Sequence, residues 1–284
     1  MKDKNVLITG ATSGIGFQTA LALAKMGAQV IVTGRSKTSA EEAVTKLKSA
    51  SGNPRVDFLL ADLSAQKNVR ALAEQVKARV ERLDVLINNA GLAASKKELT
   101  EDGIESDFAM NVVTPFLLTH LLMDSLKKSS SPRVVTLMGG DVPTTLDMDN
   151  LQSEKSFDGL NTYSQTKLAM MALMYEFAQR EKGVTINVCY PGQASTNMTR
   201  SVTPEMLPGF MRFLFPIFKL AVRDDGGKSA AKASRSSIYL ASSKDVEGVS
   251  GKYFDTNCKE AAWPPAVMDS NTREKLWEII ELLV

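Results

Sequence analysis

A glycine-rich loop between the first apolar run and the first helical segment restricts the fold more than any other feature. Residues 5–9 are apolar and β-branched, as in a buried strand, and residues 17–26 are rich in Ala and Leu. Between them stand Gly10, Gly14 and Gly16. Glycines permit a tight turn and a close backbone approach, and the free N–H groups of the helix N-terminus then attract an anion. The loop therefore predicts a βαβ unit that binds a pyrophosphate; a glycine-rich turn without a ligand is the alternative.

The alternation of apolar runs with helical patterns continues along the whole chain. Because strands that alternate with helices form parallel sheets covered on both faces, we expect a doubly wound α/β fold of the Rossmann type. It should have about seven strands and form a single domain over residues 1–284. We expect strands at 5–9, 29–33, 56–61, 85–88, 133–138, 184–190 and 252–254, and helices at 17–26, 38–50, 65–82 with Ser64 as N-cap, 100–126, from Tyr163 to about 181, 226–242 and 271–283.

The composition excludes several classes of function. With 34 basic and 32 acidic residues and no basic block, nucleic acid is not an expected partner. His120 is the only histidine, so we expect neither a histidine-based metal site nor a Ser/His/Asp triad, and we predict no metal. The cysteines, Cys189 and Cys258, lie far apart, as is typical of a reducing compartment.

The first residues lead directly into the first strand pattern. We recognise no apolar signal region before it and no membrane-spanning run in the chain, and a soluble cytoplasmic protein is the resulting expectation.

Tyr163 and Lys167 form the pair with the clearest chemical potential. They are four residues apart, so on a helix their side chains lie on one face. An ammonium beside a phenol favours the phenolate and can lower its pKa from about 10. The alternative is a helix surface with two unrelated polar residues.

Further motifs follow the glycine loop in a particular order. Asn88-Asn89-Ala90-Gly91 ends the fourth strand, Asn111 lies in the following helix, and Pro191-Gly192-x-x-x-Thr196 follows the sixth strand. Together with the glycine loop and the Tyr/Lys pair, these resemble the motifs of the short-chain dehydrogenase/reductase family over nearly the whole chain. Each motif alone is weak, whereas their common order on the expected elements is a strong signal.

The resemblance implies roles for these residues. Tyr163 would exchange a proton with the substrate oxygen, Lys167 would lower the tyrosine pKa and bind the nicotinamide ribose, and Asn111 would hold a water of the proton relay. All three would be catalytic. The expected cofactor-binding residues are Gly10, Thr12, Ser13, Gly14, Ile15, Gly16, Arg35, Asp62, Leu63, Asn89, Ala90, Gly91, Tyr163, Lys167, Pro191, Gly192 and Thr196.

The end of the second strand indicates which dinucleotide binds. An acidic residue about 20 residues after the loop would bind a ribose 2′-hydroxyl, whereas a 2′-phosphate calls for arginine. This strand ends in Thr33-Gly34-Arg35, without an acid. We therefore expect NADP(H), with a solvated basic turn as the alternative.

The family's catalytic serine is missing. Its position falls on Gly139, or on Met138 after a one-residue shift. Loss of one positioned donor to an oxyanion costs ~2.7–4 kcal/mol. Thr136, Thr144 or Thr145 could replace it. We predict an NADPH-dependent oxidoreductase that interconverts a carbonyl and an alcohol. The alternatives are a non-redox biosynthetic enzyme, such as a cyclase or isomerase, and a cofactor-binding protein with little activity.

Residues 197–225 occupy the position of the family's substrate lid, and their apolar, aromatic core at 206–220 suggests an apolar small-molecule substrate. A helix packed on the core or a partner, or shallow membrane contact, are alternatives; we do not expect the last. Residues 148–152, 250–254 and 275–277 resemble the retinol-dehydrogenase branch. By analogy with the family, the Tyr163 helix could also support a homodimer or homotetramer.

Overall fold

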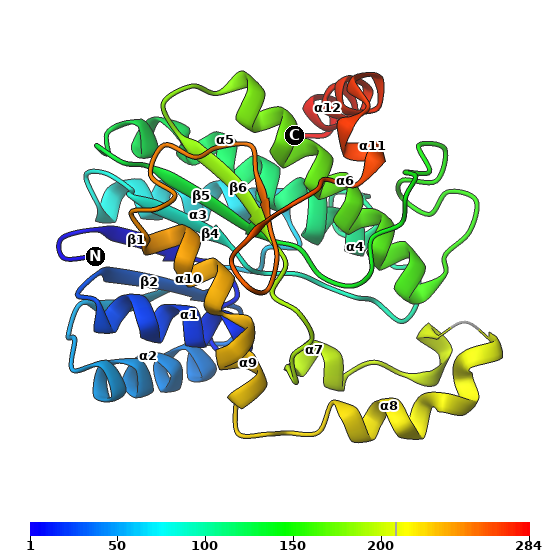
Figure 1. Ribbon diagram of the computed structural model, residues 1–284, viewed down its shortest axis with the longest axis horizontal. Helices are drawn as coiled ribbons and strands as arrows, with labels where there is room; N and C mark the ends of the chain where they lie inside the picture. The colour runs from blue at the N-terminus through cyan, green and yellow to red at the C-terminus, as the bar shows by residue number, and fades with distance from the viewer. Residues whose placement is uncertain (208) are drawn as a thin grey trace.

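A single twisted sheet forms the centre of the computed structural model, which describes residues 1–207 and 209–284 (Figure 1). The strand order is β3-β2-β1-β4-β5-β6-β7-β8; β1 to β7 are parallel, and β8 runs antiparallel to β7. The predicted doubly wound α/β fold is confirmed, with one short strand more than expected. The strands are β1 Asn5–Ile8, β2 Gln29–Gly34, β3 Val56–Leu60, β4 Val85–Asn88, β5 Arg133–Leu137, β6 Thr185–Cys189, β7 Tyr253–Phe254 and β8 Glu260–Ala261.

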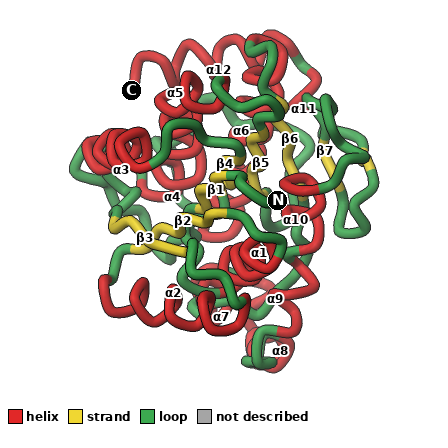
Figure 2. The backbone as a smooth tube through the Cα atoms, turned by 90° about the vertical axis from the view of Figure 1, so that its left-hand side faces the viewer, coloured by secondary structure: helices red, strands yellow, loops and turns green. Residues whose placement is uncertain are grey.

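Helices cover both faces of this sheet, as Figure 2 shows with the strands seen between two helical layers. The longer helices are α1 Gly14–Lys25, α2 Lys37–Ser51, α3 Gln66–Arg79, α5 Thr114–Lys127, α6 Gly159–Arg180, α10 Arg235–Ser242 and α12 Ser270–Leu283. The shorter ones are α4 Ser106–Phe108, η1 Ala109–Val113, α7 Asn197–Arg200, η2 Pro204–Met206, η3 Gly209–Leu214, α8 Phe215–Ala221, α9 Lys228–Ala233 and α11 Pro265–Met268.

The strands are apolar on both faces because each face has its own core. In β1, Leu7 belongs to the core under α3, α5, α6 and α12, whereas Val6 and Ile8 belong to the core under α1, α2 and α10. Alternate residues of a strand point to opposite faces, so the continuous apolar runs of the sequence supply both cores at once.

Some predicted boundaries were wrong for identifiable reasons. The helix expected at 100–126 begins only at Ser106, because Gly103 has a φ of +75° in a turn that pairs Leu99 with Glu105. Ser64 does not cap α3; instead the Asp102 carboxylate accepts a hydrogen bond from the Gln66 amide at 2.8 Å.

The helix expected at 226–242 is divided at Ser234 into α9 and α10.

The helical stretch Ser106–Lys127 corrects a further expectation. Its mean hydropathy of 1.2 and its length would allow it to cross a membrane, although we expected no such run. In the fold, 83% of its most apolar window is buried inside the protein. Its apolar character is explained by its place in the core, where the sheet and neighbouring helices cover it.

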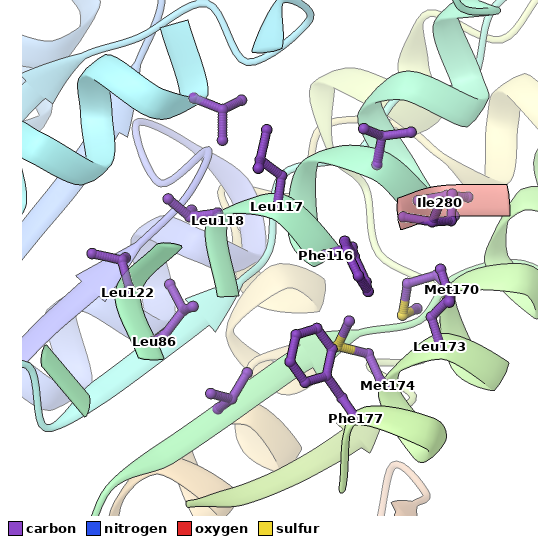
Figure 3. Close-up of a cluster of buried hydrophobic side chains, with 14 of the residues drawn as sticks. Leu86, Phe116, Leu117, Leu118, Leu122, Met170, Leu173, Met174, Phe177 and Ile280 are labelled. Atoms are coloured by element: carbon purple, nitrogen blue, oxygen red, sulfur yellow. The ribbon is translucent and has the colours of Figure 1, made fainter. Parts of the chain in front are cut away.

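The C-terminal helix α12 packs against α6, and Figure 3 shows its Ile280 beside Met170 and Leu173 of α6. Ile280 packs in one cluster with Phe116 of α5 and Met170, Met174 and Phe177 of α6, and all five are at most 1% exposed. A homodimer or homotetramer that used this face of α6 would have to displace α12.

The topology also determines where a ligand can bind. Strand order reverses between β1 and β4, which are neighbours although two strands separate them in sequence. Ligands of open α/β sheets bind at the carboxyl ends of the strands at such a switch point. The glycine loop and Asn89 follow these two strands directly.

Candidate active site

The glycine loop has the backbone conformation that a pyrophosphate site needs. Gly10 and Gly14 have φ values of +62° and +59°, which side chains other than glycine rarely adopt. At Gly16, a Cβ would lie 2.5 Å from the Asn89 side-chain nitrogen and 2.9 Å from backbone atoms of the loop. Ser13 is the N-cap of α1 and makes no side-chain cap hydrogen bond, so the first turn of α1 keeps free N–H groups.

The end of β4 is fastened to this loop. The Asn89 side chain donates to the Thr9 and Gly10 carbonyls at 2.8 and 3.0 Å. The Thr9 hydroxyl accepts from the amides of Asn89 and Ala90, both at 3.0 Å. A Cβ on Gly10 would lie 3.0 Å from the Ala90 Cα, so a side chain at position 10 would press on the loop after β4. These contacts make the floor of the predicted cofactor site rigid.

The residues predicted to contact the adenosine half lie at the ends of β2 and β3. Arg35 follows β2 and is exposed, and no ion pair engages it within the described part of the chain. The Asp62 carboxylate accepts from the amide and hydroxyl of Ser64 at 3.2 and 2.8 Å. Leu63 is buried, and its carbonyl accepts from Thr114 at 2.7 Å.

Two loop residues pack rather than expose a polar group. A Cβ on Gly34 would lie only 2.5 Å from the Thr12 methyl carbon, so a glycine at the end of β2 leaves room for Thr12. Ile15 lies in the first turn of α1, and its carbonyl accepts from Thr19 at 2.9 Å.

The segment after β6 lies against the phosphate loop. Gly192 has a φ of +81°, which turns the chain after Pro191. The Thr196 methyl would lie 3.3 Å from a Cβ on Gly14, and Asn197 donates to the Ser13 hydroxyl at 3.3 Å. A cavity of about 90 Å³ separates the two segments and is lined in part by Ser13, Gly14, Thr196 and Arg200.

Tyr163 and Lys167 lie on one face of α6, as predicted. The Lys167 ammonium is 5.7 Å from the centroid of the Tyr163 ring and donates to the Leu137 carbonyl at 3.3 Å. A Cβ on Gly91 would lie 3.4 Å from the Lys167 nitrogen, so α6 meets the end of β4 here. The Tyr163 side chain is 6% exposed and Lys167 is 5% exposed. The pair therefore stands at the carboxyl edge of β4 and β5, the same edge of the sheet at which the glycine loop follows β1.

Burial dominates the electrostatics of this pair. It raises the pKa of Tyr163 well above its usual range, and the charges of Asp107 and Tyr190 add to the rise. Burial also lowers the pKa of Lys167 to about 8, against the opposing influence of Asp107. The expectation of a lowered tyrosine pKa was thus wrong for the protein alone, because desolvation of the phenolate outweighs the nearby ammonium. At neutral pH Tyr163 is a phenol, able to donate a proton.

Gly139 occupies the position of the missing serine and is in contact with Tyr163. A Cβ at Gly139 would overlap the Tyr163 hydroxyl oxygen, and one at Gly140 would lie 3.1 Å from the ring. Gly140 has a φ of +71°. The Tyr163 hydroxyl is therefore placed against a bare backbone, in space that any side chain at position 139 would fill.

None of the three threonines considered as substitutes is directed to Tyr163. The Thr136 hydroxyl accepts a hydrogen bond from Asn88 at 3.3 Å, within the sheet. Thr144 and Thr145 are exposed, and the Thr145 carbonyl accepts from Gln165. Among the described residues, the Tyr163 hydroxyl makes no hydrogen bond to another side chain or carbonyl.

Asn111 lies in the π-turn η1, which connects α4 to α5. Its side chain bonds both backbone groups of Leu92, accepting at 3.0 Å and donating at 2.7 Å, and it also donates to Thr166 at 3.0 Å. The wider turn of a π-helix re-aims one side chain, and such turns are frequent at functional sites. Asn111 thus connects α6 to the loop after β4.

Asp107 is a neighbour of the site that the sequence reasoning missed. It is fully buried, and its Oδ1 accepts from the Ala94 amide at 2.9 Å. A signal was present, because Asp107 is an acid one helical turn before Asn111 in an apolar helix.

The predicted lid at 197–225 comprises α7, η2, η3 and α8, with Pro208 outside the described residues. In Figure 1, α8 lies apart from the sheet, below α6. Apolar side chains of η3 and α8 face solvent rather than the site: Phe213, Ile217 and Leu220 are 75%, 65% and 58% exposed. Asn197 bonds the phosphate loop at Ser13, and Arg200 and Asp224 line the cavity beside that loop.

Replacing Lys167 with Met should stabilise the protein at neutral pH. Because the pKa of Lys167 is about 8 in the fold, against 10.5 for a free lysine, the buried ammonium costs stability fully below pH 8. This cost is relieved as the pH rises from 8 to 10.5. We expect a gain on the order of 1–3 kcal/mol at pH 7 by denaturant unfolding, shrinking above pH 8. Lys46→Met, at an exposed lysine, should give no such pH dependence.

Comparisons with known proteins agree with this geometry. A family model described as short chain dehydrogenase matches residues 4–207. The chain is 38% identical to "Retinol dehydrogenase 14" of Homo sapiens, over 100% of this chain and 87% of that protein.

Two solved structures extend these comparisons. A crystal structure of an uncharacterized protein from Mycobacterium Paratuberculosis superposes with a TM-score of 0.75 at 25% identity, covering 99% of this chain and 93% of that one. The Pseudomonas aeruginosa RhlG/NADP active-site complex has a TM-score of 0.65 at 25% identity, with coverage of 90% and 95%.

Proposed function

Since this chain belongs to the short-chain dehydrogenase family of oxidoreductases, in its retinol-dehydrogenase-like branch, we propose that it is an NADP(H)-dependent enzyme interconverting a carbonyl and an alcohol on an apolar small molecule. The observation that carries the proposal is the position of Tyr163. Its hydroxyl lies against Gly139, beside the buried Lys167, at the sheet edge from which the glycine loop also emerges. A proton donor and a dinucleotide cradle thus meet at one sheet edge.

The residues around the glycine loop fit a dinucleotide. Gly10 and Gly14 turn the loop at positive φ without a side chain of their own, and the N-terminus of the 12-residue helix α1 favours the negative pyrophosphate. At the end of β2, Arg35 is exposed and no acid is near it in sequence, which favours a ribose 2′-phosphate. A related structure at 25% identity is an NADP complex, which supports the same choice.

The chemistry divides between cofactor and protein. When bound, NADP(H) supplies or accepts the hydride. Tyr163 donates the proton from its Oη to the substrate oxygen as negative charge develops there, and its raised pKa keeps that proton in place at neutral pH. Lys167, when protonated, stabilises the phenolate that remains. A protonated phenol suits the reductive direction.

Two observations support an apolar substrate. The relative at 38% identity is named a retinol dehydrogenase, and retinol is an apolar alcohol. The segment 197–225 carries exposed Phe213, Ile217 and Leu220, which could cover an apolar ligand after closure. A panel of apolar aldehydes and ketones of graded chain length, followed by NADPH oxidation, tests this choice.

Arg35→Ala should weaken NADPH binding by about 10- to 100-fold, because a charge-assisted hydrogen bond to a phosphate contributes 1.5–3 kcal/mol. NADH affinity should change by less than about threefold, since NADH lacks the 2′-phosphate. Binding can be measured by nucleotide fluorescence. Lys46→Ala, at an exposed lysine of α2, is the control. Equal loss for both nucleotides would contradict the assignment of Arg35.

The missing serine leaves two other functions to be separated by experiment. A cofactor-binding protein would bind NADPH without oxidising it over the whole substrate panel. A cyclase or isomerase would convert its substrate while the NADPH concentration stays constant. Following product and cofactor in the same reaction distinguishes both from the proposed reductase.

A further inference from the structure

Asp107 has a carboxylate that no fold-stabilising contact fully explains. The residue is 0% exposed. Its Oδ1 accepts from the Ala94 amide, but its Oδ2 is buried without a hydrogen-bond partner in the part of the chain that the structure describes. An unpartnered carboxylate oxygen in a protein interior is costly. A neutral residue at this position would avoid that cost, so the charge calls for another role.

The surroundings of Asp107 connect it to the site. Asn111, one turn further along, bonds both backbone groups of Leu92, so the two side chains fasten the loop after β4 at Leu92 and Ala94. That loop begins at Gly91, where a Cβ would lie 3.1 Å from Asn111 and 3.4 Å from the Lys167 nitrogen. The loop from Gly91 to Ala94 therefore connects Asp107 with Lys167, since Asp107 holds one end of it and Lys167 lies beside the other.

The charged groups that act on Asp107 come from its own helix and from α6. Glu105 raises its pKa and Lys167 opposes that rise, while burial contributes most and brings the pKa to about 7. In return, Asp107 favours the ammonium form of Lys167 and the protonated form of Tyr163. The Glu105 carboxylate is itself occupied by the amides of Asp107 and Phe108.

We propose that Asp107 is a positioning residue that keeps both Lys167 and Tyr163 protonated, while its Oδ1 holds the loop after β4, which would border a bound cofactor. Among the described residues, Asp107 is the acidic group whose charge favours the buried Lys167 ammonium, so removing that charge would remove this support. Tyr163 would also lose a charge that opposes its ionisation. Both effects act in the same direction, since each lets its group lose its proton at a lower pH.

Asp107→Asn tests this inference, because it keeps the shape and an oxygen that can accept from Ala94. The inference rests on the proposed reductase function. We expect the alkaline limb of kcat/KM for carbonyl reduction, measured from pH 6 to 10, to move down by about one pH unit or more. The matched control is Asp84→Asn, a fully buried aspartate at the opposite end of β4, bonded to Lys4 and Ser129. Its alkaline limb should coincide with that of the wild type.

The affinity for NADPH tests the role of Asp107 independently of the proposed reductase activity. The pH at which NADPH affinity is half lost should also fall by about one unit in Asp107→Asn, whether or not any carbonyl is reduced. If the wild type reduces nothing, the reductase proposal fails and this binding profile still decides the role of Asp107. Unchanged limbs and midpoints in Asp107→Asn would refute that role. So would the failure of both Asp107→Asn and Asp107→Ser to fold, since the carboxylate would then be structural.

Discussion

Tyr163→Phe should lower kcat for carbonyl reduction by about 10²–10⁴-fold, the usual contribution of a positioned general acid. The Tyr163 hydroxyl makes no hydrogen bond within the described chain, so its removal should cost little stability. NADPH affinity should remain within about threefold of the wild type, because no backbone group of the glycine loop changes. Steady-state NADPH oxidation, nucleotide binding and thermal unfolding of the same preparation measure the three effects.

Tyr175→Phe provides the control for the loss of Tyr163. Tyr175 lies on the same helix, three turns further on, and packs edge-on against Trp263. Its variant should keep wild-type turnover. Full activity in Tyr163→Phe would mean that another group supplies the proton, and the proposed assignment would be wrong.

Gly139→Ser should reduce activity rather than restore a missing donor. On sequence grounds, adding the family's serine is an obvious way to raise the reductase rate. The structure predicts the opposite, because a Cβ at this position overlaps the Tyr163 hydroxyl oxygen. The ring must move to admit the side chain, and a displacement of about 1 Å at a reacting group can cost on the order of 10²-fold. We expect Gly139→Ala to lose activity similarly, since the overlap involves only the Cβ.

A double-mutant cycle with Tyr163→Phe separates this overlap from other effects of the substitution. If the hydroxyl is the obstacle, Gly139→Ser should destabilise the wild type and cost much less in the Tyr163→Phe background. The free energy of unfolding of the four proteins measures this coupling. Gly139 does not have a positive φ, so backbone strain of that kind does not add to the cost of its substitution. A rise in kcat for Gly139→Ser would show that a serine donor can be accommodated.

Local chemistry made much of the fold and the cofactor cradle predictable. The β-branched runs and the glycines at 10, 14 and 16 required a parallel sheet and a tight turn regardless of distant contacts. Tyr163 and Lys167 were predictable as neighbours because four residues make about one helical turn. The start of α4 and the cap of α3 were not, because a turn at Gly103 and the distant Asp102 decide them.

The sequence by itself determined the doubly wound sheet, the glycine loop and the presence of a tyrosine and a lysine on one helical face, since these follow from period and residue type. The packing of distant segments decides that burial raises the pKa of Tyr163, that Gly139 lies against its hydroxyl and that Asp107 holds the loop beside Lys167. Those relations join α4, β5 and α6, which are far apart in the chain. Desolvation and overlap depend on the distance between atoms in space, and no spacing along the sequence contains that distance.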